Sequence, residues 1–181
     1  RQGGRPRDVE PWVKTTSPPQ QPLFDSGNTG TYGQALIIGL TEQGGMANSP
    51  AQNTPGVALL FWANDVYLPG LNLADGLVHH VVVTLSGTTV SIFVDGVAPQ
   101  GYVRTGTTWS VIGAQPFTLG SAPNTASNPV WTGHSRSTID GAGSTWFSGT
   151  LDEPAVYSGA LTSTQVLANE RAAGWPPVRP A

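Results

Sequence analysis

The segment from Asp75 to Gly96 constrains the fold of this chain more than any other stretch. β-branched residues alternate along residues 81–84 and again along residues 90–94, so that each run places apolar side chains on one face of a strand. Ser86-Gly87-Thr88 interrupts the two runs, and Asp95-Gly96 turns the chain again. Alternating apolar runs bounded by glycine-containing turns predict a β-hairpin.

The composition favours a single β-rich domain with many turns. The chain has 181 residues, enough for one domain with a proper core, and it contains 23 Gly and 16 Pro. Hydrophobic residues make up 38%, including six Trp, which argues for a packed core and against disorder. We expect a flexible basic arm over residues 1–8, a β-sandwich over residues 9–175 and a Pro-rich tail over residues 176–181.

Charge and cysteine content exclude several classes of protein. Only 10% of the residues are charged and the net charge is -3, so the basic field that nucleic acid or an anionic membrane surface requires is not present. No apolar run approaches the length needed to span a bilayer, and we expect no membrane insertion. The chain has no Cys, which excludes a zinc-thiolate site, a disulfide framework and a cysteine nucleophile.

Short apolar runs between turn residues predict about a dozen strands. Besides the hairpin, we expect strands over residues 9–16, 23–24, 32–40, 57–62, 66–68, 117–120 and 146–157, with weaker candidates at 97–104 and 107–111. Thr162 and Gln165 form a capping-box pattern that predicts one helix, and Gly174 ends it. This succession predicts an all-β antiparallel β-sandwich with one short C-terminal helix.

Four segments carry a resemblance to a known family. Residues 78–96 are similar to the central hairpin of laminin G-like, concanavalin A-like lectin domains, which end a strand in Val-Asp-Gly. Residues 117–120 resemble a later strand of that family, and residues 147–166 resemble its closing strand and short helix. Residues 10–16 resemble its early Trp-containing strand. The resemblance implies a jelly-roll fold.

Three features depart from the family pattern. Val78 stands where the family usually has Trp, and Pro154 falls inside the closing strand, where it removes a ladder donor and indicates an edge or a bulge. The family usually has another strand before the one that contains Trp12. Either that strand was cut away, or something else covers the edge of the strand that contains Trp12; an uncovered edge invites pairing with another chain.

The residues give no support for catalysis. The chain has four Glu, namely Glu10, Glu42, Glu153 and Glu170, and none belongs to the alternating pair of acids that jelly-roll glucanases place in one cleft. His79 and His80 are neighbours in a strand, and we expect one of them in the core and the other on the surface. We expect a chain that is not an enzyme.

Glycan binding needs exposed aromatic rings beside hydrogen-bonding side chains. Trp131, His134 and Arg136 lie in the long loop over residues 121–144 and fit that description, with Trp109 as a weaker candidate. The alternative role for Trp131 is to anchor the loop. We expect Trp12, Trp62 and Trp146 in the core.

The resemblance also implies calcium as a structural cofactor, since domains of this type often bind it through loop carboxylates and carbonyl oxygens. Asp152 matches the family's Asp-Glu pair and is the first candidate, and Asp25 and Asp140 lie in Gly-rich loops that could contribute. The alternative is that Asp152 only accepts hydrogen bonds from neighbouring amides.

Two functions remain open at this point. The first is a non-catalytic extracellular, cell-surface or virion-surface binding module that recognises a glycan or another cell-surface ligand through loops around residues 43–56 and 121–144. The second is a structural or protein-interaction domain that contacts a neighbouring chain of a larger assembly, such as a phage tail or capsid appendage or a bacterial surface protein. The fold alone does not decide between them.

Overall fold

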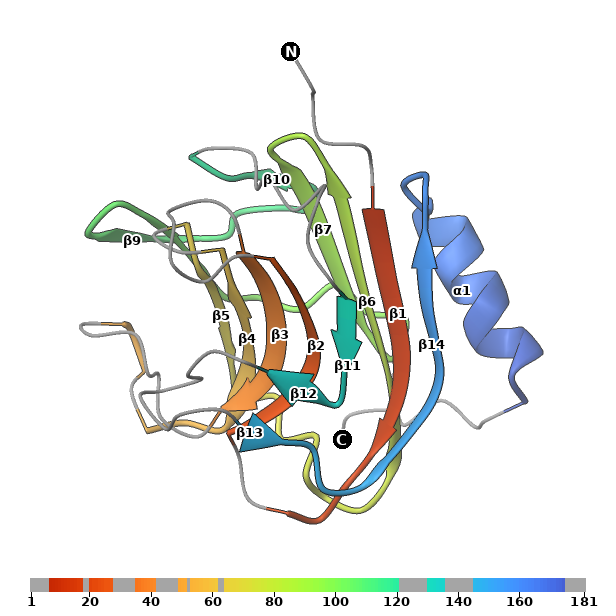
Figure 1. The fold of residues 1–181 in the computed structure, drawn as a ribbon. Coiled ribbons are helices and arrows are strands. Elements are labelled where there is room, and N and C mark those ends of the chain that lie inside the picture. Colours follow the sequence, from red (N-terminus) through yellow and green to blue (C-terminus); the bar gives the residue numbers. More distant parts are fainter. Residues whose placement is uncertain are drawn as a thin grey trace.

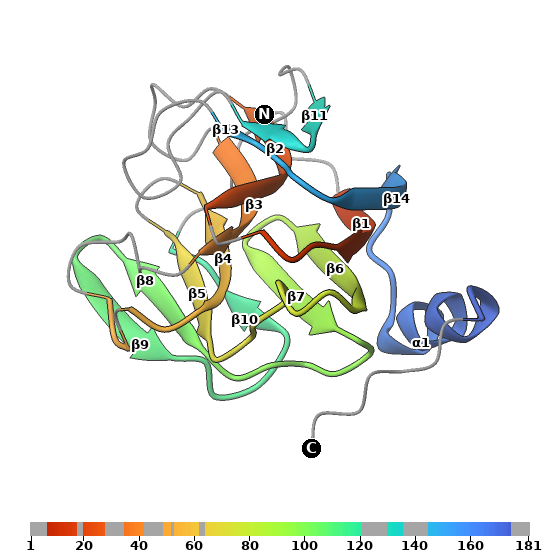
Figure 2. The same ribbon diagram turned by 90° about the horizontal axis from the view of Figure 1, so that it is seen from below.

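The computed structural model describes residues 7–17, 20–27, 35–41, 49–51, 53–61, 64–120, 130–135 and 145–174. In this part of the chain two antiparallel sheets face each other, and one helix lies outside them (Figures 1 and 2). One sheet has five strands in the order β10-β7-β6-β1-β14. Its strands are β1 (Arg7–Lys14), β6 (Val78–Ser86), β7 (Thr89–Val94), β10 (Phe117–Thr118) and β14 (Thr150–Tyr157).

The second sheet has seven strands in the order β11-β2-β3-β4-β5-β8-β9. They are β2 (Gln21–Gly27), β3 (Ala35–Thr41), β4 (Gly56–Leu60), β5 (Val66–Pro69), β8 (Tyr102–Thr105), β9 (Thr108–Val111) and β11 (Val130–Thr132). A separate pair consists of β12 (His134–Ser135) and β13 (Thr145–Trp146), and the helix is α1 (Ser163–Ala172). The all-β sandwich with one short helix is therefore confirmed.

The core fills the space between the two sheets. It is built from side chains that alternate along each strand, so each strand contributes every second residue. The five-stranded sheet supplies mainly valines and isoleucine, and the seven-stranded sheet supplies larger aliphatic and aromatic side chains: Val9, Val13, Val81, Val83, Ile92, Leu36, Ile38, Leu59, Phe61 and Leu68.

The hairpin expected from residues 75–96 forms the middle of the five-stranded sheet. β6 pairs with β7 in a register that places Val83 opposite Ile92 and Leu85 opposite Val90, all of them in the core. Gly87 in the connecting turn has a φ of 62°, a conformation that glycine adopts without strain. The local pattern therefore predicted both strands and their buried face correctly.

Pro154 lies on an edge strand and at a bulge, two places where a residue without a backbone N–H is tolerated. β14 is the last strand of its sheet, and its register against β1 shifts between Glu10 and Trp12. Glu153 has a φ of 44° at this irregularity. Of the two alternatives for the Trp12 strand, the covered edge is the one found, because β1 lies between β6 and β14 and β14 forms the edge of the sheet.

Part of the outer face of the five-stranded sheet, around Trp12 and His80, is also buried, and α1 lies on this side of the sheet (Figure 2). The rings of Trp12 and His80 stack there with centroids 4.1 Å apart, and Glu10 accepts hydrogen bonds from His80 and from Asn169 of α1. The expectation of one core and one surface histidine is therefore wrong. Both His79 and His80 are buried, one on each face of the sheet.

The termini of the domain differ slightly from the expected boundaries. β1 begins at Arg7 and Asp8 is fully buried, so the strand includes the last two residues of the expected basic arm. The capping box at Thr162 is present, with Thr162 and Gln165 each bonding the backbone amide of the other. The expected Pro-rich tail lies outside the described residues.

Candidate functional site

A pocket of about 390 Å³ opens between the segment that follows β5 and the turn that follows β7. Ligand sites of proteins commonly have volumes of this order. Its apolar walls are aliphatic, namely Pro69, Leu71, Leu73, Val94, Val97 and Pro99. Its polar lining consists of Asn72, Asp75, His79, Asp95 and Gln100. We refer to it as the His79 pocket.

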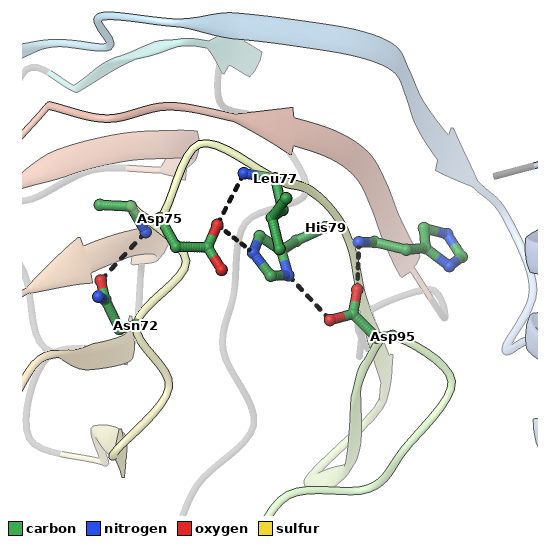
Figure 3. A network of polar contacts seen from close by, with 7 residues as sticks. Asn72, Asp75, Leu77, His79 and Asp95 are labelled. Atoms are coloured by element: carbon green, nitrogen blue, oxygen red, sulfur yellow. Dashed lines mark hydrogen bonds and ion pairs between the residues drawn. The ribbon is translucent and has the colours of Figure 1, made fainter. Parts of the chain in front are cut away.

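His79 connects two carboxylates across this pocket (Figure 3). Its Nδ1 lies 2.8 Å from Oδ2 of Asp95, and its Nε2 lies 3.0 Å from Oδ1 of Asp75. Asp75 Oδ1 also accepts the backbone amide of Leu77 at 2.8 Å, and Asp95 Oδ1 accepts the amide of His80 at 2.8 Å. The network therefore ties the 72–77 segment to the turn at the end of β7.

The backbone explains why these side chains converge. Asp95 has a φ of 52° and Gly96 a φ of 71°, so the chain reverses directly after β7 and returns the Asp95 side chain toward β6. Gly76 has a φ of 84° and donates its amide to the Thr15 carbonyl at 2.9 Å. Asp-Gly and similar turns tolerate these conformations.

The electrostatics keep this network charged. Burial disfavours the imidazolium form of His79, but the hydrogen bonds that it donates to Asp95 and Asp75 outweigh the burial and raise the pKa of His79 above its ordinary value. Burial raises the pKa of the Asp75 carboxyl, but the Leu77 amide and His79 stabilise the carboxylate more strongly, so that this pKa is lowered overall.

A second candidate feature is a pair of aromatic rings on β12 and β13, of which one is exposed and the other half-buried. His134 pairs in register with Trp146, and their ring centroids lie 4.0 Å apart with planes tilted by 38°. The side chain of Trp146 is 74% exposed. The expectation that Trp146 belongs to the core is therefore wrong, because β13 lies in a small separate pair of strands outside the two main sheets. The expectation that Trp12 is buried is confirmed, and Trp62 lies outside the described residues.

The structure separates the other predicted ligand-binding residues. Trp131 lies on β11, opposite Asp25 of β2, close in sequence to His134. Trp109 lies on β9 at the opposite edge of the same seven-stranded sheet, with the Arg104 guanidinium 6.0 Å from its ring centroid. Trp109 therefore does not belong to the same site. Arg136 lies outside the described residues.

The predicted calcium ligands do not form a metal centre in the described part of the chain. Asp25 is fully buried in β2, whereas Asp152 is exposed on β14 and its Oδ1 accepts the amide of Glu153 at 2.9 Å. Among the residues that the structure describes, no group of three or more His, Asp or Glu side chains could hold an ion. Asp140 lies outside those residues, and calcium stays a prediction.

Sequence reasoning missed Trp146, Asp75 and Asp95 as candidate site residues. The two aspartates each precede a glycine, and an Asp-Gly pair by itself indicates only a turn. Because β6 and β7 are antiparallel, the turns at their ends bring both carboxylates to His79, and this consequence could have been drawn from the hairpin. No helix within the described residues has the length and apolar character to cross a membrane.

The fold is a β-sandwich of the laminin G and concanavalin A-like type. A family model described as the concanavalin A-like lectin/glucanases superfamily matches residues 9–167, and the chain belongs to this family. Comparison with curated protein sequences finds no match. Domains with this fold are typically non-catalytic binding modules, although some belong to glycoside hydrolase or sialidase chains.

Several solved structures share the fold at low sequence identity. A CBM40 domain of the Ruminococcus gnavus IT-sialidase, bound to α2,6 sialyllactose, has a TM-score of 0.56 and 15% identity over 91% of this chain and 82% of that chain. The SAP-like pentraxin of Limulus polyphemus has a TM-score of 0.55 and 17% identity over 90% and 68%. Domain 4 of the Geobacillus stearothermophilus arabinanase AbnA, in complex with arabinotriose, has a TM-score of 0.51 and 20% identity over 91% and 66%.

Proposed function

We propose that this chain is a non-catalytic carbohydrate-binding module of a surface or extracellular protein, and that Trp146 and His134 form its primary contact with the glycan. The observation that carries this proposal is the exposed indole of Trp146, held at one side by the ring of His134. An exposed indole offers a large, flat apolar surface to a ligand, and its N–H can donate a hydrogen bond. The C–H faces of a sugar stack on such a ring, and neighbouring polar groups bond the hydroxyls.

The position of the pair supports this role. β12 follows β11 directly, so Trp131 and His134 come from one continuous segment, and β13 contributes Trp146. This segment contains two of the residues expected to bind a glycan.

The test is a glycan array with the purified chain, wild type and Trp146→Ala. We expect Trp146→Ala to weaken glycan binding by tenfold or more while the circular dichroism spectrum stays unchanged, because Trp146 is outside the core. Val111→Ala is the matched control. Val111 is 67% exposed on β9, which forms the edge of the seven-stranded sheet opposite to β11. A parallel array with a chelator tests the calcium prediction.

A second function has an observation of its own. The edge strand β14 exposes the apolar side chain of Val156 and part of the Tyr157 ring, a surface suited to a neighbouring chain of an assembly. Absence of binding to every glycan, together with stable oligomers in light scattering, would reject the lectin proposal and favour this structural role. Oligomers that dissociate in Val156→Asp would locate the contact on β14.

A further inference from the structure

We propose that the His79 pocket is a second ligand site, and that it binds a primary ammonium group carried on an aliphatic chain. This site is distinct from the Trp146 and His134 pair, because it lies between the segment after β5 and the turn after β7. It therefore goes beyond the proposed carbohydrate binding, and its test does not depend on any glycan.

The hydrogen bonds of His79 determine the charge of the pocket. Both ring nitrogens lie within hydrogen-bonding distance of a carboxylate oxygen, so both contacts need a proton between the two heavy atoms. Either His79 is an imidazolium between two carboxylates, or His79 is neutral and one aspartate carries the proton. Both arrangements give the three groups a total charge of −1. None of the described residues that line the pocket is Lys or Arg.

One carboxylate oxygen remains for a ligand. Both oxygens of Asp95 are engaged, Oδ1 by the amide of His80 and Oδ2 by His79. Asp75 uses Oδ1 for Leu77 and His79, and its Oδ2 has no side-chain partner among the described residues (Figure 3). The Asp75 side chain is also the more exposed of the two carboxylates. A donor that enters the pocket therefore meets a charged acceptor.

The aliphatic lining residues of the His79 pocket determine which chemical group can accompany the ammonium group. The apolar lining residues are aliphatic, and Leu71, Val97 and Pro99 offer no aromatic face for a sugar ring to stack on. An anion would be repelled by the net negative charge, and a neutral apolar molecule would desolvate Asp75 without pairing it. An alkylammonium ion pairs the carboxylate and buries its chain against the aliphatic walls. Free alkylamines and the lysine side chain of a protein share this chemistry.

The experiment is a titration of the full ¹⁵N-labelled chain with n-pentylammonium chloride, followed by amide chemical shifts at constant ionic strength. We expect saturable shifts confined to residues 69–79 and 94–100. n-Pentanol and pentanoate should bind at least tenfold more weakly. Nα-acetyl-lysine-N-methylamide distinguishes the sources: equal affinity indicates a protein lysine, and weaker affinity indicates a free amine.

Variants locate the interaction. Asp75→Asn removes one negative charge while its carbonyl oxygen still accepts the Leu77 amide, and it should weaken pentylammonium binding at least tenfold. Val97→Lys places a positive charge at a 57% exposed wall position outside the polar network, and it should have the same effect even if Asp75→Asn perturbs the fold. Glu153→Gln is the matched control, because Glu153 is an exposed acid on β14. Pentanol binding as tightly as pentylammonium, equal losses in Asp75→Asn and Glu153→Gln, or the absence of saturable shifts would each overturn the proposal.

Discussion

The imidazole of His79 and the carboxylate of Asp95 lie 2.8 Å apart, and together they close the open end of the β6–β7 hairpin. Asp95 also accepts the backbone amide of His80 and donates its own amide to the His80 carbonyl at 2.9 Å. A single aspartate therefore satisfies two donors from adjacent residues of β6. Because both histidines are buried, losing this carboxylate leaves polar groups without partners in a region with little access to water.

Asp95→Asn tests the contribution of this carboxylate to stability. The amide carbonyl can still accept the His80 amide, but the NH₂ group faces Nδ1 of His79 and removes the charge-assisted bond. We expect a loss of about 2 kcal/mol in the free energy of unfolding, measured by urea denaturation. Glu153→Gln, at an exposed acid on β14, should change it by less than about 0.5 kcal/mol. Equal effects of the two substitutions would contradict a structural role for the network.

The raised pKa of His79 predicts a dependence of stability on pH. The folded state holds the imidazolium proton more tightly than the unfolded state, in which His has its ordinary pKa of 6.5. The stabilisation is therefore fully present below pH 6.5 and is lost as the pH rises through the folded pKa. Urea unfolding between pH 5.5 and 9 should show wild type losing stability relative to His79→Gln in this direction. Parallel curves for the two proteins would contradict the prediction.

The raised pKa of Asp8, which contacts the backbone amide of Leu161 just before α1, predicts a second dependence of stability on pH. Burial raises the pKa of the Asp8 carboxyl to about 6 from 3.8, although the backbone amide of Leu161 stabilises its carboxylate. Because the folded state binds this proton more tightly, Asp8 makes the protein less stable as the pH rises from about 4 to 6. Relative to Asp8→Asn, wild type should lose about 2 kcal/mol across this range in denaturant titrations. A constant difference between wild type and variant would be inconsistent with this titration.

Gly56 tests how closely β4 and β5 pack. A methyl group there would lie 2.4 Å from the carbonyl oxygen of Leu68, a backbone atom that a side-chain rotation cannot move away. We expect Gly56→Ala to lower the free energy of unfolding by about 2 to 3 kcal/mol. Gly113→Ala is the control, because no atom lies within 4 Å of a methyl group at that position. It should leave stability unchanged or raise it by up to about 1 kcal/mol.

Local sequence determined the elements of this protein and their buried faces. The alternation over residues 81–94 specified the hairpin, Thr162 and Gln165 specified the helix start, and Pro154 indicated the bulged edge strand. These features depend on dihedral preferences and periodicity within a few residues, which a single sequence contains in full. The four family-like segments came in the right order, and the family match confirmed the fold.

The tertiary structure decided which side chains meet and which stay in water. His80 is buried on the outer face because α1 returns to cover it, and Trp146 is exposed because β13 pairs with β12 outside the main sheets. Asp8 contacts the Leu161 amide from the opposite end of the chain. The periodicity of a strand shows that two faces differ, but whether the second face meets solvent or a helix depends on pairing between distant segments. That long-range pairing placed the exposed Trp146 beside His134 and joined Asp75, His79 and Asp95 in one pocket.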